Sequence, residues 1–349
     1  MKVYRNIYNS IISSENLFSS WDKFKSDKQK KRDVLKFEWN LEENIFQLHR
    51  DLESGKYKHG AYSSFYLRDP KQRHVHKAEV KDRILHHAVF KVLNPIFEPT
   101  FISNSFSCQT GKGTHKGIST LDKTLRQISS NNFKPCFALK CDVKKFFDTV
   151  DHSILLSIIR KRIKDATTIR LLEKIINSFS SEYSNIFYQK GLPIGNLTSQ
   201  LFANIYLNEF DQFIKHKLKV KNYVRYTDDF VIISNDKTYL ENLIASISSF
   251  LSDKLSLKLH PKKVSICKFR QGIDFLGYIV LPHYRLLRTK TKNRIIKKLK
   301  NRVEEYKNKI IDKKSLEQSL NSYLGVLSHA DTHGLEQYLK NQFWFWLNE

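Results

Sequence analysis

The chain has 349 residues, 40% of them hydrophobic, so it is long enough for two or three domains with sizeable cores. Its net charge of +25 favours a polyanionic partner and disfavours a role in acidic small-molecule metabolism. The sequence has no run of 18 apolar residues, so it predicts no membrane span. The first residues have no signal-peptide core, so we expect a cytoplasmic protein without a membrane partner. The cysteines lack the spacing of a zinc site or a disulfide framework and are predicted to be buried free thiols: Cys108, Cys136, Cys141 and Cys267.

The first 130 residues are predicted to be mostly helical around one β-ribbon. Helical periodicity is broken by a stretch of alternating residues and, later, by a stretch rich in Gly. The predicted elements are helices within 1–60, an exposed ribbon at Tyr62–Val80 that contains Pro70, a helix at Val80–Phe97, a loop at Ser103–Gly117 and a helix at Leu121–Ile128.

The middle of the chain predicts a sheet covered by helices, and the end predicts a basic helical module. Residues 285–314 hold 13 Lys and Arg against three acidic residues, a net charge of +10. The predicted elements are a buried strand at Phe137–Val143, helices within 151–180, a loop at Gly191–Gly195, a helix at Leu197–Leu218, a hairpin at Tyr223–Ser234, a helix at Tyr239–Lys254, and strands near Leu257–Leu259, Val264–Cys267 and Phe275–Val280 that close the sheet.

Three acids interrupt these apolar strands. Asp142 ends the buried strand, and the adjacent Asp228 and Asp229 stand in the middle of the apolar hairpin. Two like charges inside a strand are costly to bury, so the chain must turn there, and a cation would hold the acids together. Mg²⁺ suits this role because it takes a few carboxylates, waters and substrate phosphates. An isolated Asp-Asp pair in a hairpin is usually a solvated turn, and only the neighbouring motifs favour the metal site over that interpretation.

Five motifs, in order along the chain, resemble those of reverse transcriptases. Tyr226-Thr227-Asp228-Asp229 is similar to their YxDD motif, whose acids bind metal together with the first Asp of an earlier motif. Residues 142–148 resemble that earlier motif, and residues 191–207 resemble the motif that opens a helix. Residues 259–263 resemble the motif that ends in a functional Lys, and residues 275–278 resemble the primer grip.

Two residues narrow the resemblance. Group II intron and retroviral enzymes usually carry Gln where this chain has Ile194, and group II intron enzymes usually carry Pro where it has Gln200. The version found here resembles the enzymes of diversity-generating retroelements, which copy a structured RNA with errors at template adenines. Defence-associated bacterial reverse transcriptases that act in phage resistance share these features, and a non-catalytic RNA-binding scaffold with the same fold is a third alternative.

The resemblance implies a role for each matching residue. It makes Asp142, Asp228 and Asp229 catalytic metal ligands, with the Val143 backbone beside them, and Lys263 a general acid or a charge for the leaving pyrophosphate. Phe147 would exclude a ribose 2′-OH, although Phe146 and Phe147 could both be core residues. The implied nucleotide-binding residues are Lys71, Arg73, Phe147, Ile194, Gly195 and Gln200, and the implied primer grip is Phe275, Leu276, Gly277 and Tyr278.

The implied fold is α+β, a right-hand polymerase with a ferredoxin-like antiparallel palm, fingers and a helical thumb. The implied cofactor is Mg²⁺, or Mn²⁺ in its place. The implied partners are template RNA, the RNA/DNA duplex, a dNTP and a small basic accessory-protein oligomer. We expect fingers at 1–90, the first part of the palm at 91–150, a helical insertion at 151–188, the second part of the palm at 189–283 and a basic helical thumb at 284–349.

Overall fold

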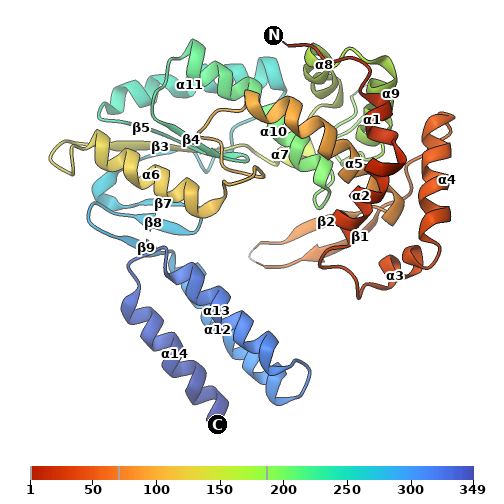
Figure 1. Cartoon of the computed structure of the whole chain (residues 1–349). Coiled ribbons are helices and arrows are strands. Elements are labelled where there is room, and N and C mark those ends of the chain that lie inside the picture. Colours follow the sequence, from red (N-terminus) through yellow and green to blue (C-terminus); the bar gives the residue numbers. More distant parts are fainter. Residues whose placement is uncertain (1, 70, 186–187) are drawn as a thin grey trace.

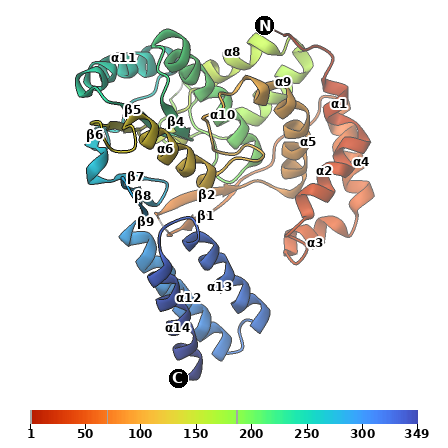
Figure 2. The same cartoon turned by 60° about the vertical axis from the view of Figure 1, so that its left-hand side comes forward.

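The computed structural model describes residues 2–69, 71–185 and 188–349, so Pro70 lies outside the described residues. The chain forms three regions: a helical N-terminal part with a projecting ribbon, a central sheet, and a C-terminal group of helices that extends away from the sheet (Figure 1). Turned by 60°, the tip of the ribbon lies beside the start of the C-terminal helices (Figure 2). No helix of the described residues is both long and apolar enough to cross a membrane. The cytoplasmic location stays a prediction.

The N-terminal region packs helices around the long helix that follows the ribbon. Its apolar side chains, among them Trp21, Phe24 and Leu85, join the main core, while the strands of the ribbon stay largely exposed. The helices and ribbon agree with the sequence prediction. The elements are α1 (Tyr8–Ile12), α2 (Ser14–Lys25), α3 (Arg32–Glu38), α4 (Leu41–Glu53), β1 (Ser63–Leu67), β2 (Arg73–Lys77), α5 (Val80–Phe97) and the 3₁₀ turn η1 (Glu98–Thr100).

The central sheet is antiparallel, with the strand order β4-β5-β3-β6. Apolar residues alternate between its two faces: Leu139 packs into the core that contains α11, whereas Ala138 packs into the core that contains α6. The elements of this region are α6 (Thr114–Ile128), β3 (Phe137–Asp142), α7 (Phe146–Thr149), α8 (His152–Arg162), α9 (Ala166–Ile176), α10 (Leu197–Gln212), the π-helical turn η2 (Phe213–Lys217), β4 (Tyr223–Tyr226), β5 (Asp229–Ser234), α11 (Lys237–Leu255) and β6 (Ser265–Lys268).

A second, smaller sheet with the order β7-β8-β9 joins the central region to the last three helices. These helices share an apolar core that includes Leu299, Phe343 and Trp346. The elements are η3 (Phe269–Gln271), β7 (Ile273–Phe275), β8 (Tyr278–Val280), β9 (Arg285–Leu287), α12 (Thr289–Lys307), α13 (Lys313–Leu327) and α14 (His333–Asn348).

Two predictions about this part of the chain are wrong. Phe275–Val280 does not close the central sheet, because Leu276 and Gly277 form a turn of positive φ that folds the segment back into the hairpin β7–β8. The basic module is not wholly helical, because Arg285–Leu287 pairs with β8 as a third strand. Near Leu257–Leu259 the described structure has only an isolated bridge, between Val143 and Leu259.

Two local predictions also need correction. The loop predicted over Ser103–Gly117 ends early, because helix α6 begins at Thr114, and Gly117 lies inside it where a Cβ atom would be 3.2 Å from Leu276. The four cysteines are free as predicted, but Cys108 is exposed because it lies in the loop before α6. Cys136 and Cys141 are buried.

Candidate active site

The three predicted acids meet at one end of the central sheet. Asp142, the last residue of β3, pairs directly with Asp229, the first residue of β5. Directly paired residues of antiparallel strands project from the same face, so both carboxylates lie on the face that carries α6 and the second sheet. Asp228 lies in the turn after β4, and Asp229 follows it as the first residue of β5.

The site is short of positive charge. Burial raises the pKa of Asp229 to about 7, the charges of Asp142 and Asp228 add to this rise, and Lys140 opposes it. Burial, followed by the charge of Asp142, also raises the pKa of Asp228. The Oδ1 atom of Asp229 is buried without a hydrogen-bond partner among the described residues. The acids therefore occupy an environment that an added cation would stabilise.

Lys263 supplies part of the missing charge. Its Nζ atom donates a hydrogen bond of 2.7 Å to Oδ2 of Asp142, from the loop that precedes β6. The backbone holds this loop in place, because the amide of His260 donates to the carbonyl of Asp142 at 2.8 Å. Of the two adjacent lysines in the motif, the structure thus brings Lys263 to the carboxylates.

The backbone of Val143 connects the end of β3 to the turn that carries Asp228. The N–H group of Val143 donates a hydrogen bond of 3.1 Å to the carbonyl of Asp228. The predicted role of Val143 as a metal ligand stays a prediction.

The acids fit a divalent cation that binds together with substrate. The described residues contain no group of three or more His, Cys, Asp or Glu side chains placed to hold a metal ion by themselves. Mg²⁺ does not require such a cage, since it is commonly held by one or two carboxylates, waters and substrate phosphates. The unpartnered oxygen of Asp229 and the raised pKa of Asp228 are the signs of such a site.

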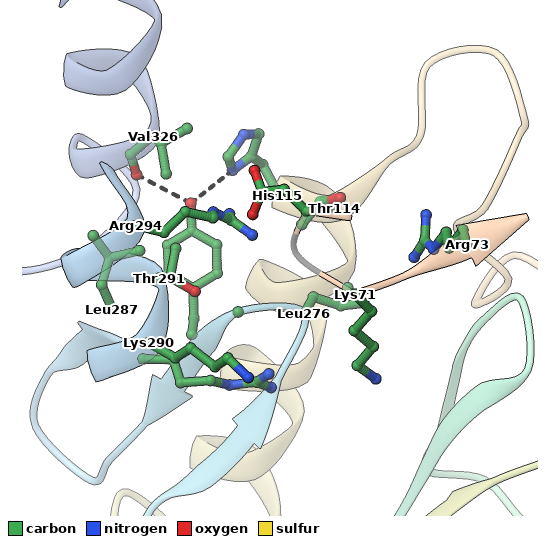
Figure 3. Close-up of a pocket in the computed structure, with 14 residues that line it drawn as sticks. Lys71, Arg73, Thr114, His115, Leu276, Leu287, Lys290, Thr291, Arg294 and Val326 are labelled. Atoms are coloured by element: carbon green, nitrogen blue, oxygen red, sulfur yellow. Dashed lines mark hydrogen bonds between the residues drawn. The ribbon is translucent and has the colours of Figure 1, made fainter. Parts of the chain in front are cut away.

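A basic cleft of about 650 Å³ is connected to these acids through Lys71, and the acids are not among the residues that line it. Lys71 belongs both to the wall of the cleft and to the charges that act on Asp228. Figure 3 shows Lys71 and Arg73 of the ribbon on one side and the side chains of the C-terminal helices on the other. The lining residues are Asp69, Lys71, Arg73, Thr114, His115, Leu276, Gly277, Tyr278, Leu287, Arg288, Lys290, Thr291, Arg294 and Val326.

Three of the four predicted primer-grip residues line this cleft. Leu276 and Gly277 form its floor at the β7–β8 turn, and the hydroxyl of Tyr278 donates to the carbonyl of Val326 at 3.0 Å (Figure 3). Phe275 does not line the cleft, because it is fully buried in the core beneath the second sheet.

The remaining predicted nucleotide-binding residues lie around the base of the ribbon. Phe147 is half-buried next to the fully buried Phe146. Ile194 is half-buried, and its carbonyl accepts the amide of His76 at 2.9 Å. Gly195 has φ +113°, and a Cβ atom there would be 2.8 Å from Val75, so close approach to the ribbon requires glycine at this position.

Gln200 is exposed on the first turn of α10, on the side that faces the N-terminal helices. It therefore lies apart from the cleft that Lys71 and Arg73 line.

The sequence reasoning did not identify two sets of residues at the site. Arg288, Lys290 and Arg294 line the cleft, and the only signal for them was the general basic run. Arg225 and Asp211 lie behind the catalytic turn, and a buried ion pair between a strand and a helix has no local sequence pattern.

The architecture and the acids point to a polymerase, and the family comparison agrees. Residues 67–280 match the protein family described as "Reverse transcriptase (RNA-dependent DNA polymerase)". The match covers strand β2 of the ribbon, all three acids and the hairpin β7–β8. The chain therefore belongs to the reverse transcriptase family, and its fold is the α+β right-hand polymerase fold with an antiparallel palm.

The chain is similar to two bacterial proteins, one of which is encoded by a group II intron. Protein YkfC of Escherichia coli K12 is 28% identical over 233 residues, covering 57% of this chain and 60% of YkfC. The group II intron-encoded protein LtrA of Lactococcus lactis subsp. cremoris is 25% identical over 305 residues, covering 68% of this chain and 49% of LtrA. The chain thus spans about half to three fifths of the length of these relatives.

Among solved structures, apo telomerase from Candida tropicalis aligns with a TM-score of 0.47 and 14% identity. The alignment covers 64% of this chain and 48% of that one.

Proposed function

We propose that this protein is an RNA-directed DNA polymerase that extends a primer on an RNA template. The observation that carries the proposal is the meeting of Asp142, Asp228 and Asp229 at one end of the central sheet, where the charge of Lys71, from a cleft walled by cations, acts on Asp228. Family membership supports the same activity. In this proposal the ribbon is the fingers, the central sheet the palm and α12–α14 the thumb.

The cleft residues bind and orient the substrates. Lys71 and Arg73 neutralise the triphosphate of the dNTP, while Arg288 and Arg294 hold the phosphates of the primer–template duplex. The turn at Leu276 and Gly277 brings backbone close to the primer end. This placement would put the primer 3′-OH beside the acids. Holding the 3′-OH and the dNTP next to each other in this way makes their bimolecular reaction effectively unimolecular.

Nucleotide transfer joins the 3′-oxygen of the primer to the α-phosphorus of the dNTP and breaks the bond between that phosphorus and pyrophosphate. Asp142, Asp228 and Asp229 would hold Mg²⁺ or Mn²⁺, which supplies a lowered 3′-OH pKa and neutralisation of the phosphates. Lys263, now bonded to Asp142, would exchange that partner for pyrophosphate and neutralise or protonate it.

The test is primer extension on poly(A) RNA with dTTP. We expect cDNA from the wild type and a rate about 10³-fold lower for Asp228→Ala, because one electrostatic contact to the reacting groups is lost. The affinity for the duplex should change less than about threefold, since the cleft cations remain. The matched control is Asp253→Ala, an exposed acid at the end of α11, which should leave the rate unchanged. Equal extension by wild type and Asp228→Ala would contradict the proposal, and duplex binding without extension by the wild type would indicate a non-catalytic scaffold.

We further propose that the enzyme belongs to a diversity-generating retroelement, copies a structured template RNA and misincorporates at template adenines. The half-buried, apolar Ile194 supports this, because it stands where related enzymes carry an amide that could check the new base pair. Replacing Ile194 with Gln should lower errors at template adenine, measured by sequencing cDNA from an RNA that contains all four bases. An unchanged error spectrum would remove Ile194 from the explanation.

The retroelement and defence roles differ in what surrounds the gene. A nearby variable-repeat cassette with differences confined to adenines would favour mutagenic retrohoming and a small basic accessory protein as partner. Absence of such a cassette, together with phage resistance lost in the Asp228→Ala variant, would favour antiviral defence.

A further inference from the structure

A buried ion pair lies directly behind the catalytic turn, on the opposite face of the sheet from the carboxylates. Arg225 of β4 and Asp211 of α10 have exposed fractions of 1% and 0%. The guanidinium donates from Nε to Oδ1 of Asp211 at 2.7 Å and from a terminal nitrogen to Oδ2 at 2.5 Å. Tyr223 donates a third hydrogen bond to the same carboxylate at 2.8 Å. Both oxygens of the carboxylate thus accept hydrogen bonds, and the guanidinium is held in a forked geometry.

The third nitrogen of the guanidinium reaches the active-site turn. It donates to the carbonyl of Thr227 at 3.1 Å. Thr227 has φ +53°, a left-handed conformation that is rare for a β-branched residue and that surrounding contacts must maintain. The hydroxyl of Thr227 donates to Ser107 at 2.7 Å, and Asn204 of α10 holds the carbonyl of Ser107 at 2.9 Å. Two independent contacts therefore fix the backbone of Thr227.

Fixing this carbonyl also orients Asp228. The carbonyl of Thr227 and the amide of Asp228 belong to one planar peptide unit, so a rotation of the first moves the Cα atom of the second. On its other side Asp228 is held by the bond from the Val143 amide to its carbonyl. A displacement of the Thr227 peptide would shift the Asp228 carboxylate relative to Asp142.

Stability alone does not explain a buried charged pair here. Taking two charges out of water is costly, and apolar side chains of similar volume are often as stable or more stable in the same place. An apolar pair at positions 211 and 225, however, would leave the Thr227 carbonyl without its donor.

We propose that Arg225, clamped by Asp211, is a positioning residue that sets the Asp228 carboxylate for nucleotide transfer. This inference rests on the proposed polymerase function. Arg225 touches neither substrate nor the reacting atoms and acts only through the peptide that joins Thr227 to Asp228.

The main test replaces the whole polar cluster with apolar residues. The triple variant Asp211→Leu, Tyr223→Phe and Arg225→Met removes all three polar side-chain groups together, so that only the Thr227 carbonyl loses its partner. We expect it to melt within a few degrees of the wild type and to bind duplex normally, with kcat about 100-fold lower and the KM for dNTP little changed. The matched control Tyr223→Phe removes one donor to Asp211 but keeps the bond from Arg225 to Thr227, and should retain kcat within about threefold. A folded triple variant with wild-type kcat would overturn the proposal.

A second variant guards against misfolding of the first. Arg225→Lys keeps the buried charge next to Asp211 but lacks the fork that reaches Thr227, and kcat should fall about tenfold at unchanged duplex affinity. Wild-type kcat in a folded Arg225→Lys variant would also overturn the proposal.

Binding of Mn²⁺, followed by electron paramagnetic resonance without substrate, provides a readout that needs no turnover. Its affinity should fall about tenfold in Arg225→Lys and stay at the wild-type value in Tyr223→Phe. If the wild type makes no cDNA, the proposed function fails, and this measurement still decides the positioning role: equal Mn²⁺ affinity in wild type and Arg225→Lys would reject it.

Discussion

The proposed palm and the proposed thumb are held together by different kinds of contact. In the palm, the turn that carries Asp228 accepts a hydrogen bond from the buried Arg225, and Asp142 accepts one from the partly exposed Lys263. In the thumb, an apolar core that includes Leu299 and Phe343 holds three helices together, and the cations around it form ion pairs at the surface.

This difference suggests a division of labour. Chemistry needs reacting atoms placed within fractions of an ångström, which hydrogen bonds of fixed geometry supply. Holding a duplex needs charge spread along a surface, and phosphate neutralisation tolerates small shifts of each side chain. The predictions below test whether the two regions can be disturbed separately.

The largest expected effect is on the stability of the thumb alone. Leu299 is fully buried in α12, and Leu299→Ala should destabilise the thumb by about 3 kcal/mol through lost burial and a cavity. Hydrogen exchange should show faster opening of α12–α14 and unchanged protection of β3 and β5. Leu139→Ala, at a fully buried site in β3, is the matched control and should have the reverse pattern. Loss of protection in both regions from Leu299→Ala would show that they unfold as one unit.

The next effect concerns sugar selection at the palm. If Phe147 excludes the ribose 2′-OH, Phe147→Val should lower the preference for dNTP over rNTP about 50-fold, measured as a ratio of kcat/KM values. Phe146→Leu, at the adjacent buried position, should affect melting and leave that ratio unchanged. A ratio unaffected by Phe147→Val would assign Phe147 to core packing.

The pH dependence of stability should locate the buried charge in the palm. Because the pKa of Asp229 is raised to about 7 in the folded protein, its charge destabilises the fold increasingly from about pH 4 to pH 7 and fully above pH 7. Without divalent ions, Asp229→Asn should therefore raise the free energy of unfolding by about 2 kcal/mol more at pH 8 than at pH 5. Denaturant titrations at the two pH values measure this, and an equal gain at both would show that Asp229 is not buried as a charge.

The smallest expected effect is on duplex affinity. Lys290→Ala with Arg294→Ala removes two cleft cations and should weaken duplex binding about tenfold at moderate salt, with a salt dependence lower by roughly two phosphate contacts. At saturating duplex, kcat should be unchanged. The control pair is Lys307→Ala with Lys309→Ala, the same loss of charge beyond the cleft at the far end of α12. An equal loss of affinity in both pairs would mean that net charge, and not the cleft, holds the duplex.

The local elements and the acids could be predicted because each has a short-range signature. Apolar alternation identified β3, and two acids inside an apolar hairpin identified the turn at Asp228. The resemblance then indicated that Asp142 joins them, and in the structure Asp142 pairs with Asp229, while the roles of these acids stay predictions.

What the sequence did not reveal depends on contacts between distant segments. Leu276 and Gly277 have positive φ angles, and the turn that they form moves the last strands into a second sheet. A Leu in the sequence does not indicate a positive φ, so this turn could not be predicted. In the sequence, nothing distinguishes Arg225 from other basic residues in strands, because its partner Asp211 lies on a separate element, α10. Phe275 belongs to the segment that resembles a primer grip, yet packing between the second sheet and the rest of its core buries it fully.

One charged contact joins the ribbon to the last helices. Asp69 at the tip of the ribbon forms an ion pair with Lys298 of α12, and Asp69 also lines the cleft together with Arg294 of the same helix. If a duplex lies between the proposed fingers and thumb, this contact would have to part for the duplex to enter sideways. An exposed pair contributes only about 0–1 kcal/mol, so the contact would open readily for loading, while its closure over a bound duplex would oppose sideways escape between successive additions.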